Sequence, residues 1–348
     1  MNTSVIIGAG IVGLHMAEIL RLKGHDVYVL DAAPYLGEHT SGRNSGVIHA
    51  GIFYKTGSFK EQVCIEGNRL TYEWLKTLKV NHKACGKWVI PEDGQEDELE
   101  PFFDKLKALP IPEVKLLEAE QVKKIEPHLR PTRAILVSST GIVDAAQYIK
   151  NFAVYLENKG VQILLNCKVE GIKDNLLQTT RGEIPFELAI NAAGLFCDEI
   201  AQLTGLKDYS IKPCRGDYFV MNKNPITKPV YHLPYKDAKG LGVHLTPTTD
   251  DQTIIGPNAF FIDNKTDYDP KSDIEVYKNS IKYYLPDLEI PNLTAGYAGN
   301  RPKLYKNNEP LPEFTILQKQ NWVHLLGIES PGLTAAPALA KQVEKLIK

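Results

Sequence analysis

The stretch SVIIGAGIVGLHMAEILRLKGHDVYVLD, residues 4–31, decides the fold. An apolar run leads into Gly8, Gly10 and Gly13, and apolar residues then recur at helical spacing. A second apolar run ends on Asp31, 18 positions after Gly13. This order predicts a strand, a tight turn, a helix and a second strand, which is the unit that binds dinucleotides.

Each glycine of this unit has a separate physical task. One glycine makes the turn, one lets the backbone approach a pyrophosphate, and one lets the helix pack on the strand. The pyrophosphate would lie at the positive end of the helix, and Asp31 would accept hydrogen bonds from a ribose. The alternative is a glycine-rich turn that binds no ligand.

The composition is that of an ordinary globular protein. The chain has 348 residues, of which 43% are hydrophobic and 24% charged, and its net charge is −2. The length fits two domains or one large interleaved fold, and the charge favours no nucleic-acid partner. No apolar run reaches 18 residues, so we expect no helix that spans a membrane.

The cysteines and the start of the chain bear on its location. The five cysteines form no CxxC pair, so we interpret them as reduced thiols rather than as disulfides or metal ligands. No basic segment or cleavage site precedes the nucleotide strand. We therefore expect a cytoplasmic protein without a metal site, and leave peripheral contact with the inner face of a membrane open.

Apolar strands alternate with helices over much of the chain. We predict helices over residues 61–79, 92–108, 117–126, 145–159, from 198 onward, 274–285 and 335–347. We predict strands over residues 87–91, 134–143, 161–165, 169–172, 186–193 and 322–328, and loops over 32–60 and 294–303. Residues 211–261 have the alternation and the turn residues of an antiparallel sheet.

These elements predict an α/β fold with a mainly parallel sheet covered on both faces. We expect a Rossmann-like FAD-binding domain and an interleaved α+β substrate domain built on a mainly antiparallel sheet. The first would comprise residues 1–80, 140–205 and 295–348, and the second residues 81–139 and 206–294.

Seven stretches, in order along the chain, carry a family resemblance. They are VIIGAGIVGL at the start, GRNSGVIHAGIFY at 42–54, INAAGLFCDEIA at 190–201, RGDYF at 215–219, LGVHLTPT at 241–248, IIGPNA at 254–259 and GIESPGLTAAPA at 327–338. With them the chain resembles the FAD-dependent oxidoreductases of the D-amino-acid-oxidase and glycerol-3-phosphate-dehydrogenase superfamily. Within that superfamily it is most similar to the L-2-hydroxyglutarate dehydrogenase/oxidase family.

The resemblance implies an FAD that is bound in an extended conformation. The loop 40–54 would run beside the flavin ring, and the turn at 330–334 would bring a helix N-terminus to the N1–C2=O edge of the flavin, where it stabilises the reduced anion. The cofactor-binding residues that we expect are Gly8, Gly10, Ile11, Val12, Gly13, Asp31, Ala32, Thr40, Ser41, Arg43, Asn44, Ser45, Val169, Ala192, Ala193, Gly194, Gly299, Arg301, Pro331, Gly332, Leu333 and Thr334.

Oxidation of a 2-hydroxy acid needs a cation for the carboxylate, a base for the hydroxyl proton and a hydride acceptor, here flavin N5. We predict His244 as the base, because histidine titrates near neutral pH. We predict Arg301 as the cation, because its planar fork pairs with a carboxylate through two hydrogen bonds. The alternatives are a histidine hydrogen-bonded within the sheet and an arginine in solvent.

Five further residues are candidates with open alternatives. His49 would contact flavin or substrate, would pack its loop, or would attach FAD covalently, as a histidine does in some relatives. The hydroxyls of Tyr54 and Tyr218 would orient the substrate or only pack. Arg43 is the second candidate cation, or anchors its own loop, and Arg215 is expected to brace the sheet.

The leading hypothesis is FAD-dependent oxidation of L-2-hydroxyglutarate to 2-oxoglutarate. Electrons would then pass to a quinone, to another acceptor or to oxygen. Within the superfamily, the alternatives are an amine or amino-acid oxidase and a glycerol-3-phosphate dehydrogenase. Outside it, they are an NAD-binding dehydrogenase of the simpler doubly wound type and a non-enzymatic redox-sensing flavoprotein.

Overall fold

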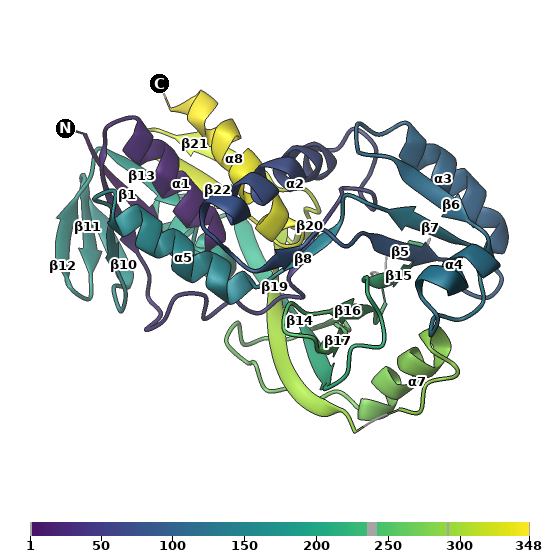
Figure 1. Cartoon of the computed structure of the whole chain (residues 1–348). Helices are drawn as coiled ribbons and strands as arrows, with labels where there is room; N and C mark the ends of the chain where they lie inside the picture. Colours follow the sequence, from purple (N-terminus) through teal and green to yellow (C-terminus); the bar gives the residue numbers. More distant parts are fainter. Residues whose placement is uncertain (1, 235–241, 291, 348) are drawn as a thin grey trace.

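A mainly parallel six-stranded sheet forms one half of the computed structural model, which describes residues 2–234, 242–290 and 292–347 (Figure 1). Its order is β21-β22-β13-β1-β2-β9, and only the edge strand β21 runs antiparallel. The strands are β1 (Thr3–Ile7), β2 (Asp26–Leu30), β9 (Gln162–Leu164), β13 (Leu188–Asn191), β21 (Thr315–Lys319) and β22 (Trp322–Leu326).

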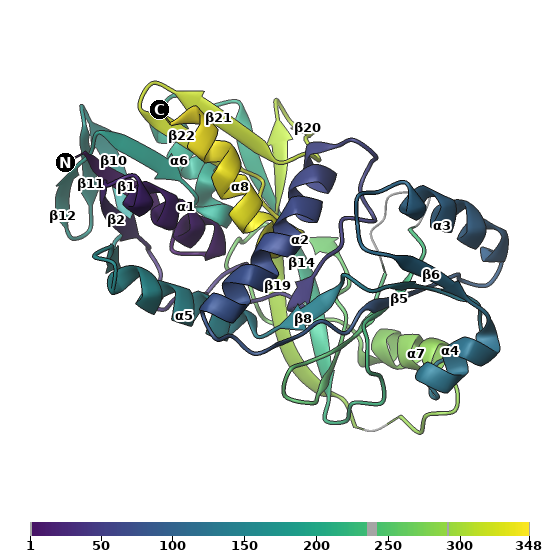
Figure 2. The same cartoon turned by 45° about the horizontal axis from the view of Figure 1, so that its top comes forward.

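Both faces of this sheet are covered, as predicted. On one face pack the helices α1 (Ile11–Leu22), α2 (Phe59–Thr77), α5 (Ala145–Glu157) and α8 (Gly332–Leu346), of which α2 and α8 lie side by side (Figure 2). The other face packs against α6 (Cys197–Leu203) and a meander of β10 (Val169–Lys173), β11 (Leu176–Thr179) and β12 (Gly182–Pro185). Strand alternation explains this, because Ile6 enters the helical core while Val5 and Ile7 enter the other core.

A mainly antiparallel ten-stranded sheet forms the second half. Its order is β20-β19-β14-β17-β16-β15-β5-β7-β6 with β18 beside β14, and only β15 and β5 pair in parallel. The strands are β5 (Lys87–Ile90), β6 (Val114–Leu117), β7 (Ala134–Val137), β14 (Tyr209–Met221), β15 (Val230–His232), β16 (Leu245–Pro247), β17 (Thr253–Ile255), β18 (Phe260–Phe261), β19 (Thr294–Lys306) and β20 (Glu309–Pro310).

Short elements complete the two halves. The helices α3 (Leu99–Lys107), α4 (Ala119–Ile125) and α7 (Ile274–Tyr284) lie around the antiparallel sheet (Figure 1). A third, small sheet joins β3 (Val47–Ile48), β8 (Gly141–Val143) and β4 (His82–Lys83), and the 3-10 turns are Glu96–Glu98 and Gly194–Phe196. The division into two domains stays a prediction.

The loop predicted over residues 294–303 is wrong, because this stretch is part of strand β19. Its glycines and Pro302 are turn signals, but tertiary pairing with β14 decides its structure. Pro302 lies opposite Pro213 in the ladder. Since neither proline has an N–H, the pair takes a position where the two strands exchange no hydrogen bond, and the ladder loses nothing.

Three other differences are local. The single strand predicted over 134–143 is two strands, because a turn at 138–140 sends β7 and β8 into different sheets. The helix predicted over 92–108 begins only at Glu96, with a 3-10 turn. Seven strands of only two to five residues were not predicted, because so short a stretch carries little periodicity: β3, β4, β6, β11, β12, β20 and β21.

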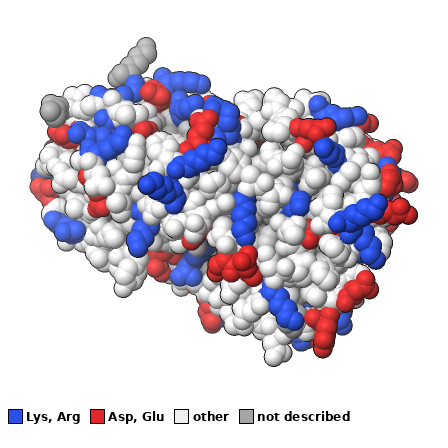
Figure 3. Space-filling model, viewed as in Figure 1, with Lys and Arg blue, Asp and Glu red and all other residues white. Residues whose placement is uncertain are grey.

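Basic and acidic side chains are intermixed on the face that Figure 3 shows, and neither kind forms a large patch of one charge there. None of the helices within the described ranges is long and apolar enough to cross a membrane. All five cysteines are free thiols, as predicted.

Candidate active site

A large cavity lies where the carboxyl ends of β1, β2 and β13 meet the antiparallel sheet. Its volume is about 1540 Å³, more than the about 300–1,000 Å³ of ordinary small-molecule sites. The predicted site residues that line it are Gly8, Gly10, Ile11, Val12, Asp31, Ala32, Thr40, Ser41, Arg43, Asn44, Ser45, His49, Tyr54, Val169, Ala192, Ala193, Gly194, Tyr218, His244, Gly299, Arg301, Pro331, Gly332 and Leu333. Segments that are up to 325 positions apart therefore share one wall.

Two predicted cofactor residues stand behind this wall. Gly13 lies in the first turn of α1, and a Cβ there would collide with the Gly8 carbonyl oxygen. Thr334 is buried in the first turn of α8, where its Oγ1 accepts a hydrogen bond from the His49 N–H at 3.0 Å. Both support the wall without being part of it.

The glycine-rich turn has the close approaches that a dinucleotide site requires. A Cβ on Gly8, whose φ is +110°, would collide with the Ala192 carbonyl at the end of β13. A Cβ on Gly10 would lie 2.8 Å from Ser41 Oγ. Helix α1 then begins at Ile11, which lines the cavity, so the positive end of the helix dipole faces the cavity. No acidic residue in the first turn offsets this positive end.

A second helix N-terminus faces the same cavity. Helix α8 begins at Gly332, directly after Pro331, and has no acidic residue in its first turn either. Two helix N-termini from opposite ends of the chain thus favour negative charge in one cavity. A dinucleotide carries such charge at its pyrophosphate, and a reduced flavin carries it at N1.

Asp31 stands at the end of β2 with its carboxylate held in place. Its Oδ2 accepts from the Ala9 N–H at 2.7 Å, and its Oδ1 accepts from the Ala33 N–H at 2.9 Å. Each oxygen keeps a second lone pair, and the residue lines the cavity. This is the position from which an acid accepts ribose hydroxyls.

We expect Asp31→Ala to lower the affinity for FAD by about 10–100-fold, because a hydrogen bond to a charged group contributes about 1.5–3 kcal/mol. The measurement is titration of the apoprotein with FAD, followed by the quenching of flavin fluorescence. Asp26→Ala is the matched control, since Asp26 begins the same strand at the end away from the cavity. Equal affinities of the Asp31 and Asp26 variants would contradict the assignment.

The loop 40–54 packs against β19 and closes the cavity. Thr40 Oγ1 donates to the Asn300 carbonyl at 3.0 Å, and Asn44 Nδ2 donates to the Ser41 carbonyl at 2.6 Å. Arg43 donates from Nε to the Glu38 carbonyl at 2.6 Å, and its guanidinium lies 4.1 Å from the centre of the Tyr268 ring. These contacts anchor the loop, which is one of the two roles considered for Arg43.

His244 precedes strand β16 and is set up as a proton acceptor. Its Nδ1 contacts the Gly242 carbonyl at 3.2 Å, and because a carbonyl only accepts, Nδ1 carries the proton. Nε2 is buried, and no hydrogen-bond partner for it exists among the described residues. Burial, with smaller contributions from nearby charges that include Arg301, lowers the pKa of His244 to about 3. The imidazole is therefore neutral, with a bare Nε2 in the wall of the cavity.

The other predicted catalytic residues line the same cavity as His244. Arg301 has no carboxylate partner within the described ranges, and its charge acts on Tyr218 as well as on His244. Burial raises the pKa of Tyr218 and Tyr54, so both hydroxyls stay protonated and can donate. Burial lowers the pKa of His49 to about 3.

Lys87 was missed by the sequence-based prediction. It lies on β5, is 1% exposed, and places Nζ 4.2 Å from the ring centre of Phe53 and 4.5 Å from that of Tyr231. Burial lowers the pKa of this lysine to about 7. The Tyr231 ring in turn stacks on His244 with 3.9 Å between centres. The signal in the sequence was a lysine that opens the otherwise apolar strand KWVI.

The groups in the cavity fit an organic cofactor better than a metal ion. No cluster of three or more His, Cys, Asp or Glu with metal-binding geometry occurs in the part of the chain that the structure describes. The glycine turn, the held acid and the two helix N-termini define a dinucleotide-binding protein.

The chain belongs to the FAD-dependent oxidoreductase family. The family model described as FAD dependent oxidoreductase matches residues 4–346. This membership confirms the predicted enzyme class and FAD as the cofactor, and it excludes the NAD-binding alternative.

Individual relatives agree with the family. The mitochondrial L-2-hydroxyglutarate dehydrogenase of Arabidopsis thaliana is 32% identical over 98% of this chain and 82% of its own length. That of Bos taurus is 35% identical, over 97% and 87%. The structure of dithionite-reduced L-α-glycerophosphate oxidase from Mycoplasma pneumoniae with FAD bound superposes with a TM-score of 0.87 at 25% identity, and covers 100% of this chain and 95% of that one. These matches confirm the predicted fold class.

Proposed function

We propose that this protein oxidises L-2-hydroxyglutarate to 2-oxoglutarate, at the carbon that bears the hydroxyl group. The observation that carries the proposal is the pairing, in one cavity, of an arginine without a carboxylate partner among the described residues and a histidine with a bare Nε2. The names of the relatives from Arabidopsis thaliana and Bos taurus supply the substrate.

The residues of the cavity divide the work of this reaction. The Arg301 guanidinium pairs with the carboxylate next to the reacting carbon, and so fixes its position. His244 Nε2 accepts the hydroxyl proton, while the protonated hydroxyls of Tyr218 and Tyr54 donate to the substrate oxygens. When bound, FAD supplies the hydride acceptor that oxidation of an alcohol to a ketone requires.

The cofactor-binding role of the lining residues is part of this proposal. The turn at Gly8 and Gly10 and the N-terminus of α1 would hold the pyrophosphate, and Asp31 the ribose. The N-terminus of α8 would stabilise negative charge on the reduced flavin. His49, whose Nε2 lies 3.5 Å from Ser330 Oγ beside α8, would contact the flavin from the loop 40–54.

A dicarboxylate has a second charged end. Arg43 stays the predicted partner for it, although the Arg43 side chain lies 3.4 Å from a Glu38 carboxylate oxygen in this structure. This partly exposed pair uses only Nη2 of Arg43, so a second carboxylate would share the guanidinium with Glu38.

The proposal for the electron acceptor names three classes, and the proposal for the location names a compartment. Electrons leave to a quinone, to another acceptor or to oxygen, and the three are separated by comparing quinone reduction, dye reduction and oxygen consumption. We place the protein in the cytoplasm, where a quinone acceptor would bring it to the inner face of the membrane.

Anaerobic flavin bleaching tests the proposal. L-2-Hydroxyglutarate is added to the holoprotein without oxygen, and the flavin absorbance is followed, with the D isomer as the matched control. Rapid bleaching by the L isomer alone is expected. An oxidised flavin with both isomers would overturn the substrate, and a panel of glycerol 3-phosphate, amino acids and amines would then identify the alternative. Slow reduction by every compound would favour a redox sensor.

Lys87→Met tests the electrostatics of the base. Burial lowers the pKa of His244 and His49, and the positive charge of Lys87 lowers both pKa values further. The pKa of Lys87 itself is lowered by burial and raised by Cys64. Removing a positive charge makes imidazolium less unfavourable, so the pKa of the base rises. We expect the acid limb of kcat/KM to move to higher pH.

The control for this prediction is Lys228→Met. Lys228 also lies over an aromatic ring, with Nζ 5.9 Å from the Trp88 ring centre, but its charge is not among those that lower the pKa of His244 or His49. A pH profile that is unchanged in the Lys87 variant would show that this lysine has no electrostatic effect on the base.

A further inference from the structure

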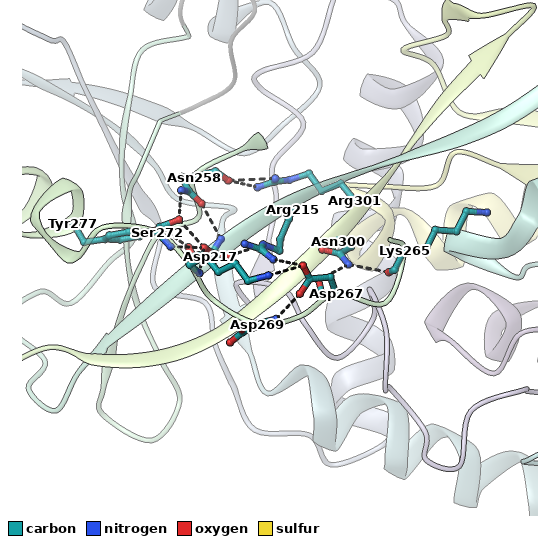
Figure 4. Close-up of polar contacts among 11 residues, drawn as sticks. Arg215, Asp217, Asn258, Lys265, Asp267, Asp269, Ser272, Tyr277, Asn300 and Arg301 are labelled. Atoms are coloured by element: carbon teal, nitrogen blue, oxygen red, sulfur yellow. Dashed lines mark hydrogen bonds and ion pairs between the residues drawn. The ribbon is translucent and has the colours of Figure 1, made fainter. Parts of the chain in front are cut away.

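Two arginines on neighbouring strands have different surroundings. Arg215 on β14 is 1% exposed and forms ion pairs of 3.0 Å with Asp217 and with Asp267. Arg301 on β19, one ladder position away, contacts only the Asn258 carbonyl among the described residues, at 3.4 and 3.5 Å (Figure 4). These contacts are long and involve one acceptor, so the guanidinium keeps most of its five donors for a ligand.

Asn258, whose backbone carbonyl contacts Arg301, is itself held through its side chain. Asn258 Oδ1 accepts from the Asp217 N–H at 2.8 Å, and its Nδ2 donates to Ser272 Oγ at 2.7 Å. Ser272 Oγ in turn donates to Asp217 Oδ2 at 2.6 Å, so the three residues form a closed ring that runs through the backbone N–H of Asp217 (Figure 4). A closed ring of bonds fixes the backbone of Asn258 more firmly than one bond would.

Asp217 is the centre of this arrangement. It is 0% exposed, and its Oδ2 also accepts from the N–H groups of Lys271 and Ser272, each at 3.0 Å. Its carbonyl accepts from Tyr277 Oη at 2.9 Å, which adds helix α7 to the network. Asp217 thus joins β14 to residues 271 and 272 through its carboxylate and to α7 through its backbone carbonyl.

Gly216 leaves the space in which the Arg301 contact is made. Alternate residues of a strand point to opposite faces, so Arg215 and Asp217 share one face while position 216 faces the other. A Cβ on Gly216 would lie 2.6 Å from the Asn258 carbonyl oxygen and 3.2 Å from Arg301 Nη1. The sequence Arg-Gly-Asp therefore combines an ion pair on one face with a gap on the other.

We propose that Arg215, Asp217, Asn258 and Ser272 form a mount that sets the direction of the Arg301 guanidinium, with Gly216 as the gap that admits it. These are positioning residues, which act on a carboxylate ligand only through Arg301. The mount determines specificity for ligands that bear a carboxylate at this place. The inference rests on the proposed function, which assigns Arg301 to the carboxylate.

A double-mutant cycle on ligand binding tests the mount. The ligand is glutarate, a dicarboxylate without a hydroxyl group, and its Kd for the holoprotein is measured by calorimetric titration. We expect Gly216→Ala to raise this Kd about tenfold, and to add less than twofold when Arg301 is already alanine. For the oxidation of L-2-hydroxyglutarate by the Gly216→Ala variant, we expect KM to rise in parallel with the Kd for glutarate, while kcat changes less than threefold.

Ser272→Ala is the second variant, because crowding at position 216 can prevent folding. It opens the ring around Asn258 without adding an atom, and we expect a three- to tenfold increase in Kd that again disappears in the Arg301→Ala background. Gly171→Ala is the control for crowding, since a Cβ there would lie 2.7 Å from Gln178 Oε1 in a different sheet. We expect it to leave Kd unchanged.

The outcomes separate the inference from the function on which it rests. If the unmodified holoprotein binds no glutarate and oxidises no hydroxy acid, the proposed function fails. If it binds glutarate, and Arg301→Ala weakens binding while Ser272→Ala does not, the function stands and the mount is disproved. An equal effect of Ser272→Ala with and without Arg301 would also disprove it.

Discussion

Replacing His244 with glutamine is expected to lower the rate of flavin reduction by the hydroxy acid about 10²–10⁴-fold, while FAD stays bound. General base catalysis contributes about this factor, and the amide of glutamine cannot accept a proton at neutral pH. The side chain can still donate to the Gly242 carbonyl, so the local structure is kept. The measurement is single-turnover flavin reduction in a stopped-flow instrument without oxygen.

His82→Gln is the matched control. His82 Nδ1 contacts the carbonyl two residues before it, Val80, at 2.7 Å, which is the contact that His244 makes with Gly242. His82 does not line the cavity. A His244 variant that is as fast as the His82 variant would reject His244 as the base and make His49 the next candidate.

The same assignment has a pH signature. Burial lowers the pKa of His244 to about 3, so the base is unprotonated at every pH well above that value. The acid limb of kcat/KM should therefore lie below pH 6.5, the ordinary pKa of histidine. The lowered pKa of His244 also makes the free energy of unfolding depend on pH. The neutral imidazole contributes fully to this free energy above pH 6.5, its unfolded-state pKa, and the contribution is lost as the pH falls from 6.5 toward 3.

Arg301→Ala is expected to raise KM for the hydroxy acid about 100-fold or more, with a smaller effect on kcat. A bidentate pair of charge-assisted hydrogen bonds contributes about 3 kcal/mol or more, which corresponds to this factor. Arg301→Lys should recover only part of the loss, because an ammonium group cannot pair through two parallel bonds. The measurement is steady-state turnover with a redox dye over a wide range of substrate concentration.

The control for this prediction is Arg133→Ala. Arg133 is an exposed arginine that pairs with Glu100 and Glu118 at the surface, so its loss should leave KM unchanged. If Arg301→Ala also left KM unchanged, the carboxylate would have to bind elsewhere. Arg43 would then be the first residue to examine.

The parts of the fold that local chemistry specifies could be predicted from the sequence. The strand, glycine turn and helix of residues 4–31 follow from spacing alone, and helix α5 begins where Asp144 caps it, its side chain accepting from the Gln147 N–H at 2.9 Å. Strand β19 could not be predicted, because its structure comes from a partner about 85 residues earlier in the chain. Pairing of that kind leaves no local pattern.

The candidate site divides in the same way. Residues in recognisable motifs, such as Gly8, Asp31 and His244, lie in the cavity wall as expected. Lys87 belongs to no such motif, and only the tertiary structure brings its Nζ to the aromatic rings beside His244. The sequence also predicted different roles for Arg301, as the cation, and Arg215, as a brace of the sheet, but only the tertiary structure shows that Asp217 and Asp267 pair with Arg215.

Helix α8 has a consequence for how the protein is made. It completes the cavity through Pro331 and Gly332, and its apolar face forms one core with α1 and α2. Ribosomes synthesise the N-terminal parts of a chain first, so the glycine turn leaves the ribosome roughly 320 residues before the helix that faces it. FAD therefore meets a finished pocket only after α8 has been synthesised, and until then the apolar surfaces of α1 and α2 that α8 covers stay exposed.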